Sequence, residues 1–409
     1  MKILIVSQYF WPESFRINEV AKTLIDKGVE IEVLTGKPNY PRGIVFPGYR
    51  AWGCQQEFYQ GINVNRIPLL PRGGGGWRLA LNYASFVLSG LIFAPWMLRG
   101  KKFDAIFVYA PSPILQTIPA IFLGWIKRCP VVLSVQDLWP ESLAATGYVQ
   151  NKTVLKLVER VVRFIYKHTD LLLVQSRAFV EPVSALASGT RVMYYPNSVD
   201  ASFTMPATST VPEVPGLGSG FSVIFAGNIG SAQAVGVIVE AAALLQKYPN
   251  IHFVILGDGS LREWMMQESR QRGLSNLHLP GSFPVETMPG FMQKASALLV
   301  TLADQPIFAL TVPNKVQAYM AAGRPIIACL NGEGARLVLE SGAGLAAPAE
   351  NAIALADTIL SLYRQTPVDR QIMGQNGRRY FQEHFNHDRL IDQLIVLLQS
   401  EVDSGKGVE

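Results

Sequence analysis

Short apolar runs alternate along the chain with longer segments in which apolar residues recur every three or four positions. The runs of strand length occupy residues 3–6, 31–34, 105–109, 131–135, 171–174, 223–226, 253–256, 297–302 and 325–329. Such runs between helical patterns are typical of βαβ units with buried parallel strands. The pattern therefore predicts an α/β protein with two parallel sheets, one before residue 200 and one after residue 220.

Residues 201–220 interrupt this alternation with a segment rich in Pro, Thr, Ser and Gly, which is typical of a linker. We therefore predict a first domain over 1–200, a linker over 201–220, a second domain over 221–385 and a C-terminal segment over 386–409. Two doubly wound domains joined in this way leave a central cleft between them. That arrangement suits transfer between two substrates, one held by each domain.

Composition narrows the class of protein. Hydrophobic residues make up 49% of the 409 positions, and the three cysteines are too widely spaced to indicate a metal pair or a disulfide framework. Residues 1–200 carry 22 Lys and Arg against 13 Asp and Glu, whereas the remainder carries 14 against 18. The basic half predicts an anionic partner surface. No zinc-finger spacing or aromatic RNA-binding motif indicates nucleic acid, so a membrane surface is the favoured partner.

The N-terminus predicts a buried strand, because Lys2 is followed by only four apolar residues and this is too short for a signal peptide. A longer apolar segment covers residues 77–98, which include Phe86, and basic residues flank it. Trp77 and Trp96 stand near its ends, where interfacial anchors are expected. We expect it to insert into one leaflet of a membrane. A buried helix and a true membrane span are the alternatives, and a span would split the predicted sheet.

A basic stripe gives a second indication of a membrane. At about 100° per residue, its five cations fall within an arc of roughly 80° on one helix. They are Lys152, Lys156, Arg160, Arg163 and Lys167. We predict that this face, with Lys156, Arg160 and Arg163 at its centre, meets lipid phosphates. An ordinary solvated face is the alternative.

Two loops place polar residues where strands of the first domain end. In residues 8–19, Glu13, Ser14 and Arg16 follow the first strand, and Arg16 is suited to clamping a phosphate. A rigid proline-containing loop before a helix is the alternative.

The second loop, residues 134–142, carries Gln136, Asp137 and Glu141 after another buried strand. A carboxylate at this edge can orient or deprotonate an acceptor hydroxyl. The alternative for Asp137 is a helix N-cap.

The second domain carries three segments that favour nucleotide-sugar binding. Residues 222–230 and 253–260 are apolar runs that open onto glycine turns, the latter with Gly257 and Asp258. Residues 312–327 begin as a helix start and lead into the next strand. Ligands sit at the carboxyl edge of such sheets, and helix N-termini there form an anion site for a pyrophosphate.

With these motifs in place, the chain resembles glycosyltransferase family 4, retaining enzymes of the GT-B fold with two doubly wound Rossmann-like domains facing a central cleft. The resemblance spans nearly the whole chain. It is closest to bacterial surface-polysaccharide transferases of the N-acetyl-L-fucosamine transferase type. Residues 9–18, 134–142, 227–230 and 313–325 carry the closer match, and residues 195–200 match the family's passage into its second domain. The resemblance implies that the first domain binds the acceptor and that the second binds the donor. It also implies a last helix that crosses back to the first domain.

The chain departs from the family at its charged donor-binding positions. An arginine and a lysine that commonly contact the donor diphosphate are replaced by Asn228 and Gln233. Two glutamates, eight residues apart in the family, are replaced by Leu310 and Ala318. We expect Lys315 to supply the missing cation, because its helix N-terminus already favours phosphate. The alternative for Lys315 is a surface lysine. The departures imply a donor unlike UDP-glucose, such as a 6-deoxy or N-acetylated sugar.

We therefore expect a glycosyltransferase that moves a sugar from a nucleoside-diphosphate donor to a polyprenyl-pyrophosphate-linked saccharide, at the cytoplasmic face of the inner membrane. Asp137 and Glu13 are expected to orient the acceptor. The leaving diphosphate is expected to meet the donor-binding residues Asn228, Gln233, Gly257, Asp258, Thr311, Val312, Pro313, Asn314 and Lys315. No Asp-x-Asp occurs in the sequence, so we predict catalysis without a metal or other cofactor. A nucleotide-sugar 2-epimerase and a non-catalytic donor-binding partner in polysaccharide assembly remain as alternatives.

Overall fold

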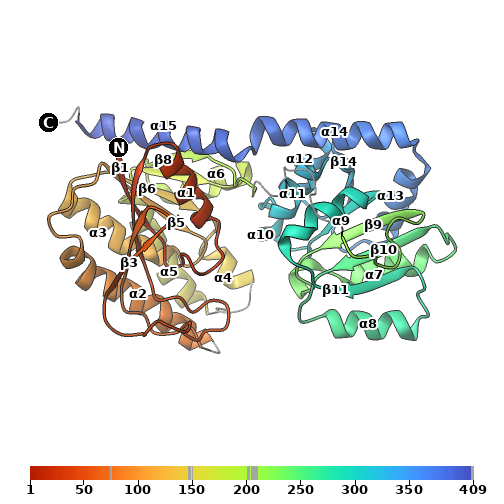
Figure 1. Ribbon diagram of the computed structural model, residues 1–409, viewed down its shortest axis with the longest axis horizontal. Coiled ribbons are helices and arrows are strands. Elements are labelled where there is room, and N and C mark those ends of the chain that lie inside the picture. Colours follow the sequence, from red (N-terminus) through yellow and green to blue (C-terminus); the bar gives the residue numbers. More distant parts are fainter. Residues whose placement is uncertain (74–75, 146–148, 150, 200–202, 204–210, 407–409) are drawn as a thin grey trace. The chain divides into compact units, whose positions relative to one another are not determined.

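The computed structural model describes residues 1–73, 76–145, 149, 151–199, 203 and 211–406. The chain divides into two compact units (Figure 1). Unit 1 consists of Met1–Pro196 with Asp388–Glu409, and unit 2 of Asn197–His387. Each unit is built around its own sheet, which confirms the predicted α/β class with two doubly wound domains.

Unit 1 contains an eight-stranded sheet in the order β3-β4-β2-β1-β5-β6-β7-β8. Its strands are β1 (Lys2–Val6), β2 (Glu30–Thr35), β3 (Gln55–Tyr59), β4 (Ile62–Arg66), β5 (Ala105–Ala110), β6 (Val131–Val135), β7 (Leu171–Val174) and β8 (Arg191–Tyr194). Only the edge strand β3 runs antiparallel to its neighbour. The order reverses between β1 and β5, and this reversal is the point where a doubly wound sheet places its ligand.

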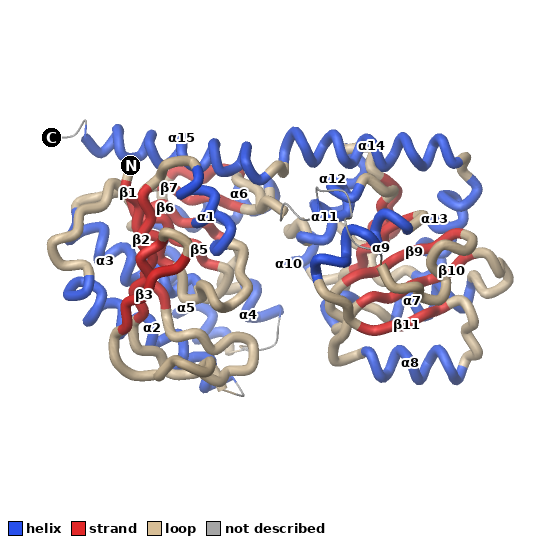
Figure 2. Tube along the Cα trace, in the orientation of Figure 1, coloured by secondary structure: helices blue, strands red, loops and turns tan. Residues whose placement is uncertain are grey.

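The helices of unit 1 cover both faces of its sheet. They are α1 (Ile17–Asp26), α2 (Gly76–Met97), α3 (Thr117–Lys127), α4 (Glu141–Ala145), α5 (Lys152–Lys167), α6 (Val180–Ala187) and α15 (His387–Lys406). Right-handed crossovers on the two sides of the reversal place helices on opposite faces. Accordingly, α1 and α15 share one apolar core, whereas α2, α3 and α5 lie on the other side of the sheet (Figure 2).

Unit 2 contains a six-stranded parallel sheet in the order β11-β10-β9-β12-β13-β14. Its strands are β9 (Phe221–Ala226), β10 (Ile251–Leu256), β11 (Leu277–Gly281), β12 (Ala297–Thr301), β13 (Ile326–Cys329) and β14 (Gly344–Ala347). Its helices are α7 (Gly236–Leu244), α8 (Arg262–Gln271), α9 (Met288–Lys294), α10 (Pro306–Ala309), α11 (Asn314–Ala322), α12 (Glu333–Glu340), α13 (Ala352–Arg364) and α14 (Pro367–His384). Here the strand order reverses between β9 and β12.

The boundaries between the units differ from the predicted ones. Much of the predicted linker, 201–202 and 204–210, lies outside the described residues. Val211 and Val214, in contrast, are buried in the core of unit 2, so the end of that segment belongs to the domain. The final helix α15 returns to unit 1, where Ile391, Leu394 and Leu398 are buried against residues of β1 and α1.

Candidate functional site

Two glycine turns meet at the carboxyl edge of the unit 2 sheet. The turn after β9 and the turn after β10 are joined because Ile229 donates its backbone N–H to the Asp258 carbonyl at 2.8 Å. A Cβ on Gly257 would lie 1.9 Å from the Gly227 carbonyl oxygen, and one on Gly259 would lie 2.3 Å from that of Ile229. Both glycines have positive φ, which other residues rarely adopt. The two turns therefore fit together only without side chains.

Lys315 points into this edge from the first turn of α11. A Cβ on Gly227 would lie 3.0 Å from its Nζ, and the ammonium group lies 3.7 Å from the centre of the Phe225 ring. Nζ is buried and has no hydrogen-bond partner within the described part of the chain. Burial lowers the pKa of Lys315 to about 7. A buried, unpartnered amine beside a glycine turn is an incomplete site that an anion would complete.

Asn228 and Gln233 occupy the mouth of the same turn and hydrogen-bond to each other, Asn228 Nδ2 donating to Gln233 Oε1 at 3.0 Å. Thr301 at the end of β12 donates to the carbonyl of Gln233. These two amide side chains therefore form a neutral rim. Glycosyltransferase family 4, which the sequence resembles, commonly has an arginine and a lysine at these two positions.

The loop before α11 brings its backbone to the same edge. Tyr319 accepts a hydrogen bond from the backbone N–H of Ala226 at 3.1 Å, so α11 is fixed to the last residue of β9. Pro313 occupies the N-cap position and makes no side-chain cap, and Asn314 begins the helix. The first backbone N–H groups of a helix have no partner within that helix, and the N-terminal end carries a partial positive charge. The helix start and Lys315 thus present positive charge together.

In unit 1, Glu13 has become a structural carboxylate. It is buried, and its Oε1 accepts backbone N–H groups from Asn39 at 2.7 Å and Tyr40 at 2.6 Å. Burial raises the pKa of Glu13, and these two hydrogen bonds oppose the rise. Glu13 therefore holds the loop after β2 against the loop after β1, which is a structural role.

Arg16 and Asp137 come from different loops to the strand-order reversal of unit 1. Burial raises the pKa of Tyr109 at the end of β5. The positive charge of Arg16 lowers this pKa, and the negative charge of Asp137 raises it. Both side chains therefore lie near Tyr109. Nη1 of Arg16 is buried without a hydrogen-bond partner among the described residues. Burial raises the pKa of Asp137 to about 6, a value suited to a base near neutral pH.

The remaining predicted acceptor residues are less tightly placed. Ser14 and Glu141 are exposed. Gln136 donates from Nε2 to the hydroxyl of Ser134 at 2.8 Å, which fixes its orientation at the end of β6.

Sequence reasoning missed a buried amide cluster beside these residues. Gln116 accepts the backbone N–H of Gln8 at 2.6 Å, and Gln8 donates from Nε2 to Asn82 at 2.7 Å. Asn82 belongs to α2, so this polar contact fixes the apolar helix to the end of β1. A lone asparagine in an otherwise apolar helix was the available signal.

The prediction that Phe86 contacts the membrane is wrong. Phe86 is fully buried, because α2 turns it toward the sheet, where it lies against Gly36 and Leu69 near the end of β2. Trp77 and Trp96, in contrast, are 66% and 69% exposed. The exposed apolar residues of α2 lie on the side away from the sheet, and they are Trp77, Leu81, Leu88, Ile92 and Trp96.

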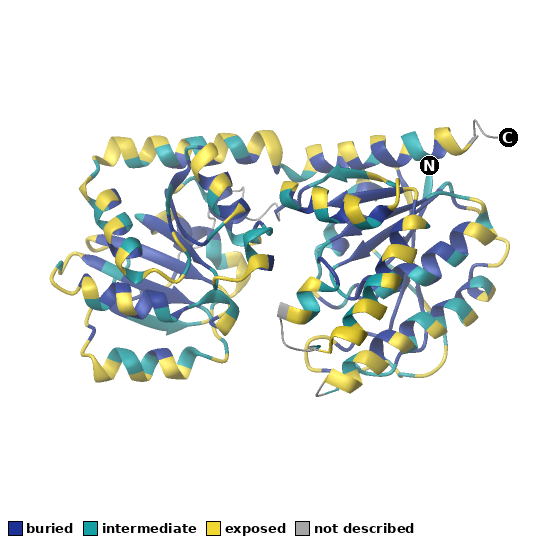
Figure 3. Ribbon diagram, turned by 180° about the vertical axis from the view of Figure 1, so that it is seen from behind, coloured by how far each residue is buried: buried dark blue, intermediate teal, exposed yellow. Residues whose placement is uncertain are grey.

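Helices α3 and α5 extend this exposed apolar surface. Trp125 of α3 and Phe164 of α5 are both exposed and both contact the ring of His168. Figure 3 shows this side of the molecule with its exposed positions in yellow. Lys156 and Arg160 are exposed, but Arg163 pairs with Glu159 at 2.8 Å. Glu159 lies just outside the predicted arc of cations. The predicted basic stripe therefore includes one cation, Arg163, that is already paired with an acidic residue.

Both units match models of glycosyltransferase domains. Residues 14–198 match the glycosyl transferase 4-like domain, and residues 220–365 match the glycosyl transferases group 1 family. The chain is 26% identical over 341 residues to the probable glycosyltransferase WbjE of Pseudomonas aeruginosa, covering 80% of this chain and 81% of that protein. It is 25% identical over 349 residues to the putative colanic acid biosynthesis glycosyl transferase WcaI of Escherichia coli K12, covering 79% and 82%.

Solved structures show the same fold. Sucrose-phosphate synthase from Thermosynechococcus elongatus matches with a TM-score of 0.74 at 16% identity, covering 98% of this chain and 99% of that one. HepE from Anabaena in complex with UDP matches with a TM-score of 0.69 at 14% identity, covering 98% and 100%. These likenesses confirm the predicted GT-B architecture.

Proposed function

We propose that this chain, a glycosyltransferase of the GT-B fold, moves a sugar from a nucleoside-diphosphate donor to a polyprenyl-pyrophosphate-linked saccharide with retention of configuration. The observation that supports this most is the unpartnered amine of Lys315, buried against Gly227 beside the start of α11. The HepE structures contain UDP and, in one case, UDP with glucose. WcaI is named for colanic acid biosynthesis, and a relative of part of the chain is named an O-antigen chain mannosyltransferase. These names favour a role in surface polysaccharide, such as O-antigen or capsule.

The donor diphosphate would meet Lys315 and the backbone amides of Val312 and Asn314. The predicted contribution of the Thr311 amide does not hold, because this N–H donates to the Phe308 carbonyl at 3.2 Å. Charge develops on the leaving diphosphate in the transition state, and donors already in place stabilise it without reorganisation. Asn228 and Gln233 would hydrogen-bond to the same group as neutral donors. The uncharged rim and the absence of glutamates at Leu310 and Ala318 favour a 6-deoxy or N-acetylated donor sugar, such as N-acetyl-L-fucosamine.

Asp137 would act on the acceptor hydroxyl. With its pKa near 6, it is ionised at neutral pH and able to accept a proton. Arg16 would pair with an acceptor phosphate, because its buried Nη1 lacks a partner in the described chain. Ser14, Gln136 and Glu141 would hydrogen-bond to the saccharide. We assign Glu13 a positioning role, through the backbone of Asn39 and Tyr40.

The apolar surface of unit 1 would lie in the cytoplasmic leaflet of the inner membrane. By length and composition, α2 is the one helix among the described residues that qualifies as a membrane span, although 28% of its most apolar window is buried. Asn82, Phe86 and Gly90 are buried on one side of α2, where Asn82 bonds to Gln8 and Gly90 lies against Pro119 of α3. A spanning helix would have to release these contacts. Insertion of the other side, with Trp77 and Trp96 at the interface, keeps those contacts.

A transfer assay tests the reaction. Purified protein in detergent would be incubated with UDP- and GDP-sugars, with and without a polyprenyl-pyrophosphate-saccharide, in the presence of EDTA. We expect a lipid product one sugar heavier by mass spectrometry, formed without metal, and its loss in K315M and D137N. Conversion of the free donor without acceptor would replace the proposal with an epimerase. Donor binding without any product would replace it with a non-catalytic partner.

Flotation with vesicles tests the membrane surface. We expect wild-type protein to float with vesicles containing phosphatidylglycerol, and the W77A/W96A variant to lose most of this binding. The matched control is W264A, because Trp264 is also exposed but lies on α8 of unit 2. Equal loss in both variants, or none in either, would rule out this surface as the membrane contact.

A further inference from the structure

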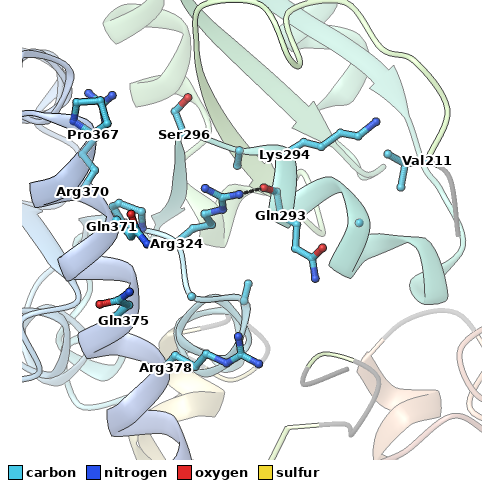
Figure 4. Close-up of a pocket in the computed structure, with 15 residues that line it drawn as sticks. Val211, Gln293, Lys294, Ser296, Arg324, Pro367, Arg370, Gln371, Gln375 and Arg378 are labelled. Atoms are coloured by element: carbon cyan, nitrogen blue, oxygen red, sulfur yellow. Dashed lines mark hydrogen bonds between the residues drawn. The ribbon is translucent and has the colours of Figure 1, made fainter. Parts of the chain in front are cut away.

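Unit 2 contains a large cavity at the opposite edge of its sheet from Lys315 (Figure 4). Ser296 and Pro325, which line it, directly precede β12 and β13, so the cavity lies at the amino ends of these strands. The ends of α9 and α11 and one side of α14 complete its wall. Its volume is about 1080 Å³, which is enough for a ligand the size of a sugar phosphate or a nucleotide.

The cavity is rich in positive charge. Lys294, Arg324, Arg370 and Arg378 line it together with three glutamines, and no Asp or Glu is among the described residues of its wall. The α14 residues share one helical face, because Pro367, Gln371, Gln375 and Arg378 are spaced by three or four positions. Four like charges without a counter-ion raise each other's free energy, so the wall favours an anion.

Two of these cations already have a structural role. Arg370 donates to the carbonyls of Tyr363 at 3.1 Å and Gln365 at 3.0 Å, where α13 ends, and it lies over the ring of Phe221. Arg324 donates one terminal nitrogen to the carbonyl of Gln293 in the last turn of α9. Cations at helix carboxyl ends are stabilised by the helix dipole. The charge of Arg370 is therefore explained without a ligand, and that of Arg324 only in part.

Arg378 has no such structural role, and its side chain is exposed to solvent. No hydrogen bond or ion pair is formed by its guanidinium group within the described chain. Its stem lies against the turn after α11, since a Cβ on Gly323 would be 3.6 Å from its Cδ. Gly374, one turn earlier, lets α14 approach so closely that a Cβ there would lie 2.1 Å from the Gly323 carbonyl oxygen. The backbone beneath Arg378 is thus tightly packed. Figure 4 shows the Arg378 guanidinium and the Gln293 side chain facing the same open space, whereas the Arg324 guanidinium is directed at the carbonyl of Gln293.

We propose that this cavity binds a small phosphate-bearing molecule, at a site separate from the donor site. The guanidinium groups of Arg324 and Arg378 present planar pairs of N–H donors, which match the oxygens of a phosphate. Gln293 and Gln375 supply amides that hydrogen-bond to hydroxyls or to further phosphate oxygens. This inference does not depend on the transfer reaction, because none of its residues belongs to the proposed donor or acceptor sites.

Calorimetric titration of the full-length protein with inorganic pyrophosphate tests the proposal. The K315M background removes the principal cation of the donor site, so that remaining binding reports on the cavity. We expect one site in K315M, weakened at least tenfold in K315M/R378Q and unchanged in K315M/R379Q. Arg379 is a matched control, because it is an exposed arginine on the same helix that bonds to Asn376 and does not line the cavity.

Two outcomes would overturn the inference. The first is that K315M binds no pyrophosphate at all. The second is that R378Q and R379Q weaken its binding equally, as diffuse charge would. Thermal melting of each variant separates lost binding from lost folding, and K294Q, which removes an exposed cation from the rim, gives a second variant. In the wild-type background we expect R378Q to leave sugar transfer unchanged when pyrophosphate is absent.

Discussion

The loops that follow the first strand of each unit, β1 and β9, are held in place in different ways. After β1, side chains hold the loops together: Glu13 binds two backbone N–H groups, and Gln8 is linked to Gln116 and Asn82. After β9, the two turns pack backbone against backbone, because Gly257 and Gly259 approach the neighbouring turn more closely than any residue with a side chain could. Among the described residues, each arrangement leaves buried polar atoms without a partner: Gln8 Oε1 and Arg16 Nη1 in the first, and the amine of Lys315 in the second.

The contrast teaches how each unit can hold a different substrate. A turn built from glycine backbone brings N–H groups close to a compact diphosphate. A network of paired side chains shapes a larger and more varied surface, such as a saccharide requires. Substitutions should therefore affect the two units through different mechanisms.

The largest effect is expected from G257A. Its Cβ would overlap the Gly227 carbonyl at 1.9 Å, and its φ of 147° is strained for alanine. We expect a loss of more than about 4 kcal/mol in the free energy of unfolding, measured by urea denaturation. Gly273 is the control, because it also has positive φ but nothing lies within 4 Å of its Cβ position. A G273A loss as large as that of G257A would show that φ alone, and not close approach, sets the cost.

In unit 1, E13A should have the next largest effect. Removing the carboxylate leaves the backbone N–H groups of Asn39 and Tyr40 without an acceptor in a buried place. We expect a loss of about 3 kcal/mol in stability, and a smaller loss for E13Q, whose amide oxygen can still accept. If E13A unfolds like the wild type but loses transfer, Glu13 acts directly on the acceptor.

Lys315 should take up a proton when the donor binds. At pH 8 its amine is largely neutral in the free protein, since its pKa is about 7, and a diphosphate would restore the charge. Calorimetry of UDP binding in buffers of different ionisation enthalpy should detect this uptake, and K315M should abolish it and weaken binding by about 2 kcal/mol, or ~thirtyfold. Because the pKa of Lys315 falls on folding from 10.5 to about 7, the folded protein loses stability as pH falls through that window, and the loss is complete below about pH 7. K315M should therefore be more stable than the wild type at pH 6, and a less stable K315M would contradict the unpaired amine.

The smallest effect on stability is expected from D137N. The pKa of Asp137 rises on folding from 3.8 to about 6, so its contribution to stability is lost as pH rises through that window. At pH 7.5 we expect D137N to have a higher melting temperature than the wild type and a free energy of unfolding that is larger by about 1–2 kcal/mol. At pH 3.5 we expect the two proteins to melt at the same temperature. A gain at both pH values would assign the effect to packing. Transfer should fall at pH 7.5 even as stability rises.

The sequence was sufficient to predict the main strands of both sheets. All nine apolar runs are strands, because continuous burial on both faces leaves a clear pattern. The runs did not reveal the other five strands, β3, β4, β8, β11 and β14. Of these, β3 is a largely polar edge strand, and β14 is short and built from small residues. Such strands are defined by their partners more than by their own composition.

The same limit explains the errors in the site. An apolar helix with apolar residues on every side carries no periodicity to show which face is buried, so Phe86 and Trp96 were indistinguishable in α2. The position of Lys315 at a helix start and that of Asp137 after a strand could be predicted from the sequence. That the amine is unpaired, and that Glu13 is occupied by the loop at Asn39, depends on contacts between distant segments that no local pattern contains.

The return of α15 to unit 1 has a consequence for how the chain is made on the ribosome. Unit 2 is continuous from Asn197 to His387, so it can fold as soon as it has emerged. Unit 1 begins first but lacks Ile391, Leu394 and Leu398 of its core until the last helix has been synthesised. The N-terminal half must therefore wait, with part of its apolar core uncovered, for the final residues of translation. A stop codon before residue 388 would leave unit 2 intact and unit 1 incomplete.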